Sequence, residues 1–202
     1  MNELSEHVLN NWDDDNQCAY CFLYRVGNDG PVEQFVKRFK VPNFRIENKK
    51  FVPDESYANQ AQQILSACLR KHYSRIREEH NCRYLVPIPS HRQGYGDGNL
   101  LRVARLLSAE FGFDLLDRAL LRTKEITISH KARYGERPKH QAHVQTLSWV
   151  WKDRLQGGIL LVDDVITTGT TSQACRHVIA ESTGIRSDSF VRLFLAKVNL
   201  QD

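Results

Sequence analysis

The chain has 202 residues, a formal net charge of +4, 41% hydrophobic residues and 26% charged residues. A chain of this length can bury one substantial core, so we expect one globular unit with an appended region. No apolar stretch is long enough to span a bilayer, and no apolar segment opens the chain as a signal peptide would. We therefore expect a cytoplasmic protein with no membrane partner.

The cysteines favour free thiols over a disulfide framework, because five residues cannot all pair. Cys18 and Cys21 have the spacing of half a zinc site. A structural zinc ion needs four ligands, and no second pair lies nearby in the sequence. We place both cysteines in a strand-like run that ends at Val26, and we predict no metal there.

The first 82 residues predict a hairpin followed by a helix. Segments 18–26 and 34–41 are expected to be strands on either side of the turn sequence Gly27-Asn28-Asp29-Gly30-Pro31. Segment 54–76 predicts one helix, whose far end, 70–77, is strongly basic. The apolar face of this helix would carry Ala58, Ala61, Ile64, Leu65, Cys68, Leu69 and Tyr73.

A short apolar strand is predicted over 83–88, followed by a loop that starts with Ser90, His91 and Arg92. This loop combines a hydroxyl with cationic groups, which is a composition suited to holding pyrophosphate at the end of a strand. The alternative is an ordinary strand-to-helix connection. Segment 99–111 has the apolar spacing of a helix, and 113–121 contains a second strand.

Residues 123–151 form a long polar stretch that is rich in His, Lys and Arg. A connection of this length in a compact domain is usually a lid or a disordered segment. We therefore expect a flexible lid here, just before the next strand.

The most informative segment is 159–171, in which four apolar residues lead into Asp163 and Asp164. A buried parallel strand of this kind delivers its last residues to the edge of a sheet, where ligands bind in open α/β folds. The turn from Thr167 to Thr171 supplies hydroxyl donors and one glycine before a helix over 172–182. The start of a helix attracts phosphate, whereas the carboxylates suit sugar hydroxyls or a hard cation such as magnesium. In the alternative interpretation, the two acids only cap the helix.

Segment 159–171 resembles the phosphoribosyl pyrophosphate (PRPP) signature of the type I phosphoribosyltransferases at every position. The resemblance implies an α/β fold with an open parallel sheet flanked by helices. It also implies that Asp163 and Asp164 hold the ribose hydroxyls and stabilise the oxocarbenium-like transition state, with Mg²⁺ on the leaving pyrophosphate and direct or indirect contact to these acids. The ribose 5-phosphate site would comprise Asp163, Asp164, Val165, Ile166, Thr167, Thr168, Gly169, Thr170 and Thr171. The pyrophosphate site would comprise Ser90, His91 and Arg92.

A finer resemblance, over about 83–197, is to the ComF-like branch linked to competence proteins. It is carried by Val86-Pro87-Ile88-Pro89 and by a basic stretch that starts at Ser129 and includes Lys131, Arg133 and Arg137. It implies an N-terminal α+β hood over 1–82 and a catalytic core over 83–202, with a lid at about 123–151. Lys131 or Arg133 would close over the pyrophosphate, and Lys124 is a further candidate for that role. Relatives of this kind commonly form homodimers.

Three functions remain open from the sequence. The first is a transferase that moves ribose 5-phosphate from PRPP to an unknown nitrogen acceptor. The second is a regulator that binds PRPP without turnover. The third is an accessory protein in DNA uptake or defence, which the basic residues between Arg70 and Lys139 would favour. We do not favour nucleic-acid binding, because PRPP is itself a polyanion that requires cations.

Overall fold

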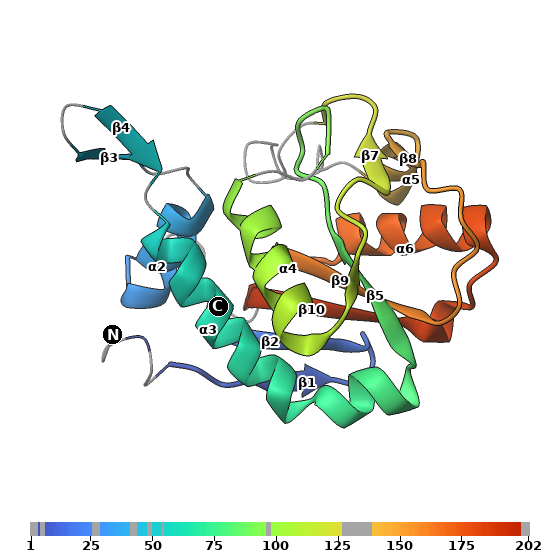
Figure 1. Cartoon of the computed structure of the whole chain (residues 1–202), viewed down its shortest axis with the longest axis horizontal. Helices are drawn as coiled ribbons and strands as arrows, with labels where there is room; N and C mark the ends of the chain where they lie inside the picture. The colour runs from blue at the N-terminus through green and yellow to red at the C-terminus, as the bar shows by residue number, and fades with distance from the viewer. Residues whose placement is uncertain are drawn as a thin grey trace.

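The computed structural model describes residues 4, 7–25, 29–40, 44–47, 50–53, 55–95, 98–126 and 139–198. Its centre is a six-stranded sheet (Figure 1) in the order β1-β2-β10-β9-β5-β6. The strands are β1 (Asn11–Asp13), β2 (Cys18–Tyr24), β10 (Phe190–Val198), β9 (Gly158–Ile166), β5 (Cys82–Pro87) and β6 (Asp114–Leu115). Five of them run parallel, and only the edge strand β1 is antiparallel to its neighbour. This arrangement confirms the predicted α/β fold with a mostly parallel open sheet.

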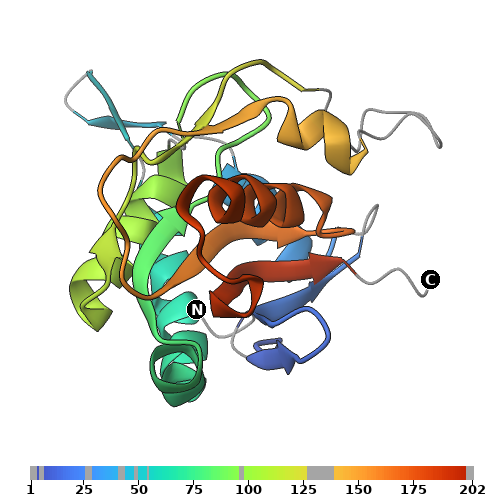
Figure 2. The ribbon, with the colours of Figure 1, turned by 90° about the vertical axis from the view of Figure 1, so that its right-hand side faces the viewer.

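Helices cover both faces of the sheet (Figure 2). One face carries α2 (Pro31–Lys40), α3 (Ser56–Lys71) and α4 (Gly98–Phe111), and α6 (Thr170–Thr183) lies on the other. Strand β9 alternates between them, because Leu160 and Val162 belong to the first core and Ile159 and Leu161 to the second. Alternation of this kind is the period of a β-strand. A strand of this period directs two consecutive side chains, such as those of Asp163 and Asp164, to opposite faces of the sheet.

The predicted hairpin over residues 18–41 is wrong in its second half. Strand β2 forms as expected, but residues 31–40 are the helix α2 and not a strand. The residues Val32, Phe35, Val36 and Phe39 are all buried, and their spacing is helical. Pro31 stands at the first position of the helix, where proline is well tolerated because its missing N–H has no partner there.

The other predicted elements form close to their expected positions. The long helix is α3, which is followed by a π-helical turn, η1 (Arg75–Glu79). The segment expected to contain the second strand includes β6 and the start of β7 (Leu120–Arg122). Outside the main sheet, β7 pairs with β8 (Leu147–Trp149), and β3 (Phe44–Glu47) pairs with β4 (Lys50–Pro53). The remaining short helices are α5 (His140–Val144) and η2 (Ser187–Ser189).

The N-terminal region contributes directly to the central sheet. Strand β2 pairs with β10 over Cys18–Tyr24, so part of the expected hood lies inside the α/β unit. The boundary at residue 82 stays a prediction. Within the part of the chain that the structure describes, no helix is long and apolar enough to cross a membrane.

Candidate functional site

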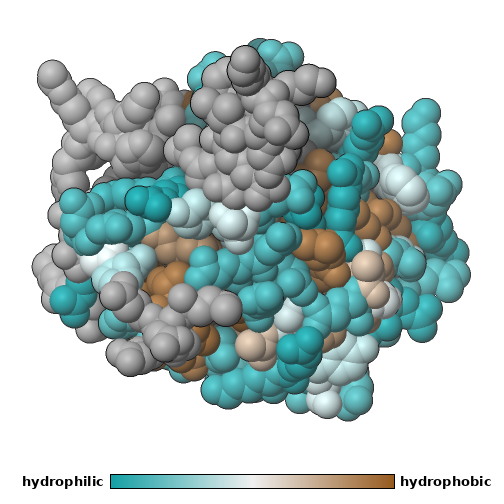
Figure 3. All heavy atoms as spheres, turned by 60° about the vertical axis from the view of Figure 1, so that its left-hand side comes forward, coloured by the Kyte–Doolittle hydropathy of each residue, from teal (hydrophilic) through white to brown (hydrophobic). Residues whose placement is uncertain are grey.

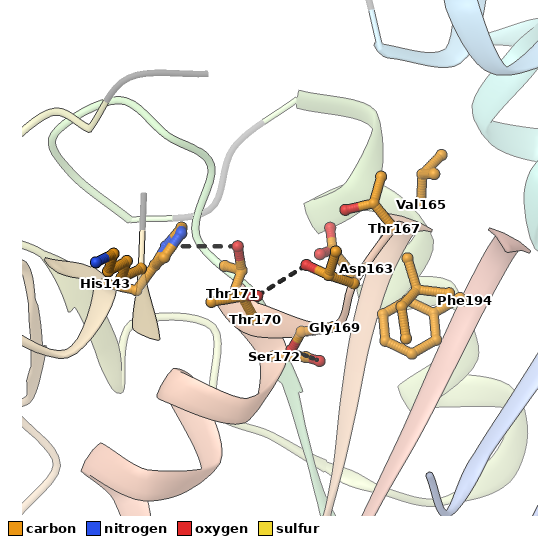
Figure 4. A pocket seen from close by; sticks show the side chains of 12 residues that line it. His143, Asp163, Val165, Thr167, Gly169, Thr170, Thr171, Ser172 and Phe194 are labelled. Atoms are coloured by element: carbon orange, nitrogen blue, oxygen red, sulfur yellow. Dashed lines mark hydrogen bonds between the residues drawn. The ribbon is translucent and has the colours of Figure 1, made fainter. Parts of the chain in front are cut away.

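A cavity of about 200 Å³ lies where β9 ends and α6 begins. Its walls come mainly from the loop between the two elements, and Figure 4 shows their side chains around it. The lining residues are Lys139, His143, Asp163, Val165, Ile166, Thr167, Thr168, Gly169, Thr170, Thr171, Ser172 and Phe194. All of the predicted 5-phosphate residues except Asp164 therefore gather around one cavity.

The two acids of the signature lie on opposite faces of β9. The strand continues past both of them to Ile166, although Val165 packs against the same core as Leu160 and Val162. Asp163 belongs to the face of Ile159 and Leu161 and lines the cavity. Asp164 does not line it, and its Oδ2 lies 3.4 Å from Nζ of Lys40 at the end of α2. The sequence predicts the same ligand contacts for both acids, whereas in the structure only Asp163 lines the cavity and Asp164 contacts Lys40.

The environment of Asp163 disfavours the charged form of its carboxyl group. Burial raises the pKa of Asp163 well above its ordinary value, and the neighbouring charge of Asp164 adds to the effect. The main-chain N–H of Asp164 donates a hydrogen bond of 2.8 Å to Oδ1 of Asp163 and opposes this shift. A ligand that donates hydrogen bonds or carries a cation would stabilise the charged carboxylate.

The loop after β9 is shaped by its own residues. Gly169 adopts a left-handed conformation with φ 75° just before the first turn of α6. A side chain is unfavourable there, so glycine allows the sharp entry into the helix. The hydroxyl of Ser172 donates 2.9 Å to the carbonyl oxygen of Gly169, and the hydroxyl oxygens of Thr168 and Thr170 lie 2.8 Å apart. The first N–H groups of a helix lack partners within it, so this loop offers donors to an anion.

A buried arginine supports this loop from below. Arg192 on β10 donates from Nη1 to the hydroxyl of Ser172 at 3.2 Å and from Nη2 to the carbonyl oxygen of Asn16. Its side chain is only 3% exposed. The contact connects the turn between β1 and β2 with the start of α6. Arg192 lies outside the predicted signature, and its position in an apolar strand gave no local sign of a role.

Four residues line the cavity but were not among the predicted site residues: Lys139, His143, Ser172 and Phe194. His143 and Lys139 come from the α5 region, and Nδ1 of His143 lies 3.4 Å from the hydroxyl oxygen of Thr171. Figure 4 shows the ring of His143 directed toward Thr171. Burial lowers the pKa of His143 to about 4, and the charges of Arg122 and His140 contribute. The imidazole is therefore neutral near pH 7 and can either donate or accept a hydrogen bond.

The predicted pyrophosphate loop lies at the same edge of the sheet. Strand β5 runs parallel to β9, with Pro87 opposite Val162, and the N–H of Ile88 donates 2.9 Å to the carbonyl oxygen of Val162. The loops that follow these two strands are therefore neighbours, although about 70 residues separate them along the chain. Ser90 and Arg92 are exposed and His91 is half-buried, but none of the three lines the cavity.

The catalytic residues expected from the lid, Lys131 and Arg133, lie outside the described residues, and their roles stay predictions. The same is true of Arg137. Lys124 is described and exposed. It does not line the cavity, and its role also stays a prediction.

The described residues contain no group of three or more His, Cys, Asp or Glu side chains that could hold a metal ion. Mg²⁺ usually keeps several water ligands and binds one or two carboxylates together with substrate phosphates. Asp163 is half-buried and lines the cavity, so its carboxylate could supply one such ligand. The arrangement therefore fits a magnesium ion that enters with a phosphate ligand.

The basic end of the long helix is largely engaged within the protein. Arg70 pairs with Glu110, and Nη2 of Arg75 lies 2.8 Å from Oδ1 of Asp14. Arg77 donates 2.8 Å to the carbonyl oxygen of Cys82. The face shown in Figure 3 is mostly hydrophilic, and its apolar atoms lie in separate patches. These contacts give the arginines structural roles that need no nucleic acid.

Comparisons with known proteins were made by sequence and by structure. No protein-family model and no curated protein matches the chain. Adenine phosphoribosyltransferase from Saccharomyces cerevisiae is 15% identical with a TM-score of 0.40, covering 81% of this chain and 88% of its own. Orotate phosphoribosyltransferase from Aeropyrum pernix is 14% identical with a TM-score of 0.37, and the match covers 82% of this chain and 81% of that protein. Adenine phosphoribosyltransferase from Trypanosoma brucei is 10% identical with a TM-score of 0.43, and the match covers 90% of this chain and 84% of that protein. At these identities and TM-scores the similarity assigns no residue and no activity to this chain, so the phosphoribosyltransferase superfamily and its ComF-like branch both stay predictions.

Proposed function

We propose that this protein binds PRPP and transfers its ribose 5-phosphate to a nitrogen acceptor, with release of pyrophosphate. The observation that carries the proposal is the cavity at the end of β9. There, the half-buried carboxylate of Asp163 and the start of α6 lie on one cavity wall, and a second loop with cationic residues follows the adjacent parallel strand. This edge of the sheet would therefore suit a ligand that carries a phosphate, a diol and a second phosphate group.

The 5-phosphate would bind in the loop from Thr167 to Thr171. Main-chain N–H groups at the start of α6 and the threonine hydroxyls supply donors, and the partial positive charge of the helix end favours the dianion. The neutral ring of His143 beside Thr171 adds a further polar group to the cavity wall. Anion binding here needs no lysine of the P-loop type.

The ribose would lie against Asp163, which is the acid on the cavity side of β9. Its carboxylate would accept hydrogen bonds from the sugar hydroxyls. As the bond to pyrophosphate breaks, positive charge develops on the ribose ring, and a carboxylate fixed nearby stabilises that charge. Asp164, which pairs with Lys40, would act from the opposite face by holding the end of the strand in place.

The pyrophosphate would lie beside the loop formed by Ser90, His91 and Arg92. Mg²⁺, when bound with PRPP, neutralises the leaving group, and Asp163 is the carboxylate best placed to contact it directly or through water. Lys131 and Arg133 keep their proposed role at this end of the ligand. A cytoplasmic location, a homodimer and ComF-like kinship belong to the same proposal.

Calorimetry with PRPP and Mg²⁺ on the full chain tests the binding step. Pyrophosphate release in the presence of purine bases, pyrimidine bases, glutamine or ammonia then tests turnover. Binding followed by release with one acceptor supports the transferase, and Asp163→Asn serves as the site control. Tight binding with no release for any acceptor favours the PRPP-sensing regulator, and no binding at all contradicts the proposal.

A further inference from the structure

Arg122 on β7 is a fully buried arginine that contacts the loop proposed to hold pyrophosphate. Its side chain is 1% exposed. Nε donates 2.5 Å to the carbonyl oxygen of Ser90, and Nη1 donates 2.7 Å to the hydroxyl oxygen of Thr146. It therefore connects the loop after β5 with the segment that follows α5.

The main chain around Arg122 strengthens the same connection. Arg122 and Gly94 exchange two backbone hydrogen bonds of 2.8 and 2.9 Å, and the N–H of Ile126 donates 3.0 Å to the carbonyl oxygen of His91. On the other side, the N–H of Thr123 donates 2.8 Å to the carbonyl oxygen of Thr146. The loop over 90–94 is therefore bonded along its length to a strand about 30 residues away in the sequence.

The charge of Arg122 also points to an anion. Both side-chain partners named above are neutral oxygens, so they satisfy its N–H groups without cancelling its charge. Burial disfavours the charged form, but a guanidinium stays protonated in proteins. The carboxylate of Asp163 is near enough to favour that charge. A buried cation is costly unless anions offset it: Asp163 supplies one, and a phosphate group near this loop would add a second.

We infer that Arg122 is a positioning residue for the pyrophosphate half of the proposed PRPP site. The peptide unit after Ser90 is planar, so a fixed carbonyl also fixes the direction of the N–H at its other end. Arg122 thereby sets the orientation of the loop backbone and places positive charge beneath it. The ligand class is a diphosphate, either free or as part of PRPP. This inference rests on the proposed function.

The test measures the two halves of the ligand separately on the full chain. Calorimetry gives the dissociation constants of pyrophosphate with Mg²⁺ and of ribose 5-phosphate for the wild type, Arg122→Lys and Arg122→Gln. Arg118→Lys, an exposed arginine on the same segment, is the matched control. We expect both Arg122 variants to weaken pyrophosphate binding by about tenfold and ribose 5-phosphate binding by less than about threefold. Equal weakening of both ligands, or no change in either, would overturn the inference.

A second pair of variants keeps the test decisive if the Arg122 variants do not fold. Thr146→Val removes one acceptor of Arg122 but leaves its charge in place, whereas Thr146→Ser keeps the hydroxyl. We expect Thr146→Val to weaken pyrophosphate binding by about threefold and Thr146→Ser to restore it. Identical affinities in the two Thr146 variants would contradict the role of Arg122. A wild type that binds neither ligand would refute the proposed function itself.

Discussion

The two loops at the edge of the sheet are held in place in different ways. The loop from Thr167 to Ser172 is shaped mainly by its own sequence, through the left-handed Gly169 and the bond from Ser172 back to its carbonyl oxygen, with one added hydrogen bond from Arg192 to Ser172. The loop from Ser90 to Gly94 instead takes its main support from Arg122 and Ile126, in a distant segment. Local support allows a short motif to specify one half of the site. Distant support leaves the other half dependent on the rest of the fold.

This difference predicts how substitutions act. Changes in the 5-phosphate loop should act on the ligand through residues next to the cavity. Changes in the pyrophosphate half should act through the segment that supports it. Variants at neighbouring residues and at matched positions distinguish these two kinds of effect.

The largest effect is expected from Asp163, because it lines the cavity and its neighbour does not. Asp163→Asn should weaken PRPP binding by about 100-fold, since charge-assisted hydrogen bonds contribute up to about 3 kcal/mol. Asp164→Asn should weaken it by less than about tenfold, since that side chain pairs with Lys40 on the opposite face of β9. Calorimetry with circular dichroism as a check on folding measures both. Equal losses would show that the two acids act together on the ligand.

The dependence of stability on pH tests the environment of His143, which contacts Thr171 in the 5-phosphate loop. Its pKa is about 4 in the folded protein against 6.5 ordinarily, so the native state binds fewer protons than the unfolded state between these values. Its contribution is therefore present above pH 6.5 and is lost as the pH falls toward 4. Between about pH 7.5 and about pH 5 the loss should be about 2 kcal/mol.

His143→Asn should remove this part of the pH dependence, as measured by urea unfolding at both pH values. His72, whose pKa is also lowered by burial, shifts stability in the same direction. It is unchanged in the variant, so the difference between variant and wild type isolates His143. The same pH slope in both proteins would mean that His143 titrates normally.

The two glycines at opposite ends of α6 allow the effect of backbone strain on stability to be distinguished from an effect on ligand binding. Gly169 and Gly184 have φ values of 75° and 73°, so alanine at either position should reduce stability by about 1 kcal/mol. Only Gly169 lies in the cavity wall. Gly169→Ala should therefore weaken PRPP binding several-fold, and Gly184→Ala should not. Thermal unfolding and calorimetry together test this, and a ligand effect from Gly184→Ala would point to a general change in the helix.

The smallest effect is expected from a single hydroxyl of the loop. Thr168→Val removes the group that lies 2.8 Å from the hydroxyl of Thr170, and should weaken phosphate binding by about 1 kcal/mol. Thr183→Val, at the far end of the same helix, is the control. Titration of both variants with ribose 5-phosphate gives the comparison. An unchanged dissociation constant for Thr168→Val would place the phosphate elsewhere in the turn.

The same contrast explains how much could be predicted from the sequence. Strand β9, its loop and α6 are continuous in the sequence, so their order and the gathering of Asp163 with Thr167 to Thr171 followed from the pattern. The separation of Asp163 from Asp164 did not, because two adjacent acids predict the end of a buried strand, whereas β9 continues to Ile166.

Arg122 and His143 lie beside or within the polar stretch after β6, where no period indicates which side chains are buried. Their roles depend on contacts with Ser90 and Thr171 that only the folded chain creates. The second half of the expected hairpin was wrong for a different reason. The turn sequence over 27–31 favours a hairpin, whereas the apolar residues that follow it have the spacing of the helix α2.

The pairing of β2 with β10 has a consequence for how the protein folds. The partner of Cys18–Tyr24 is Phe190–Val198, so the sheet cannot be completed until nearly the whole described chain has been synthesised. Until then β2 has no parallel neighbour, and an unpaired strand invites association between chains. Contacts between such distant segments slow folding, so refolding should include a late phase in which the N-terminal strand joins the sheet.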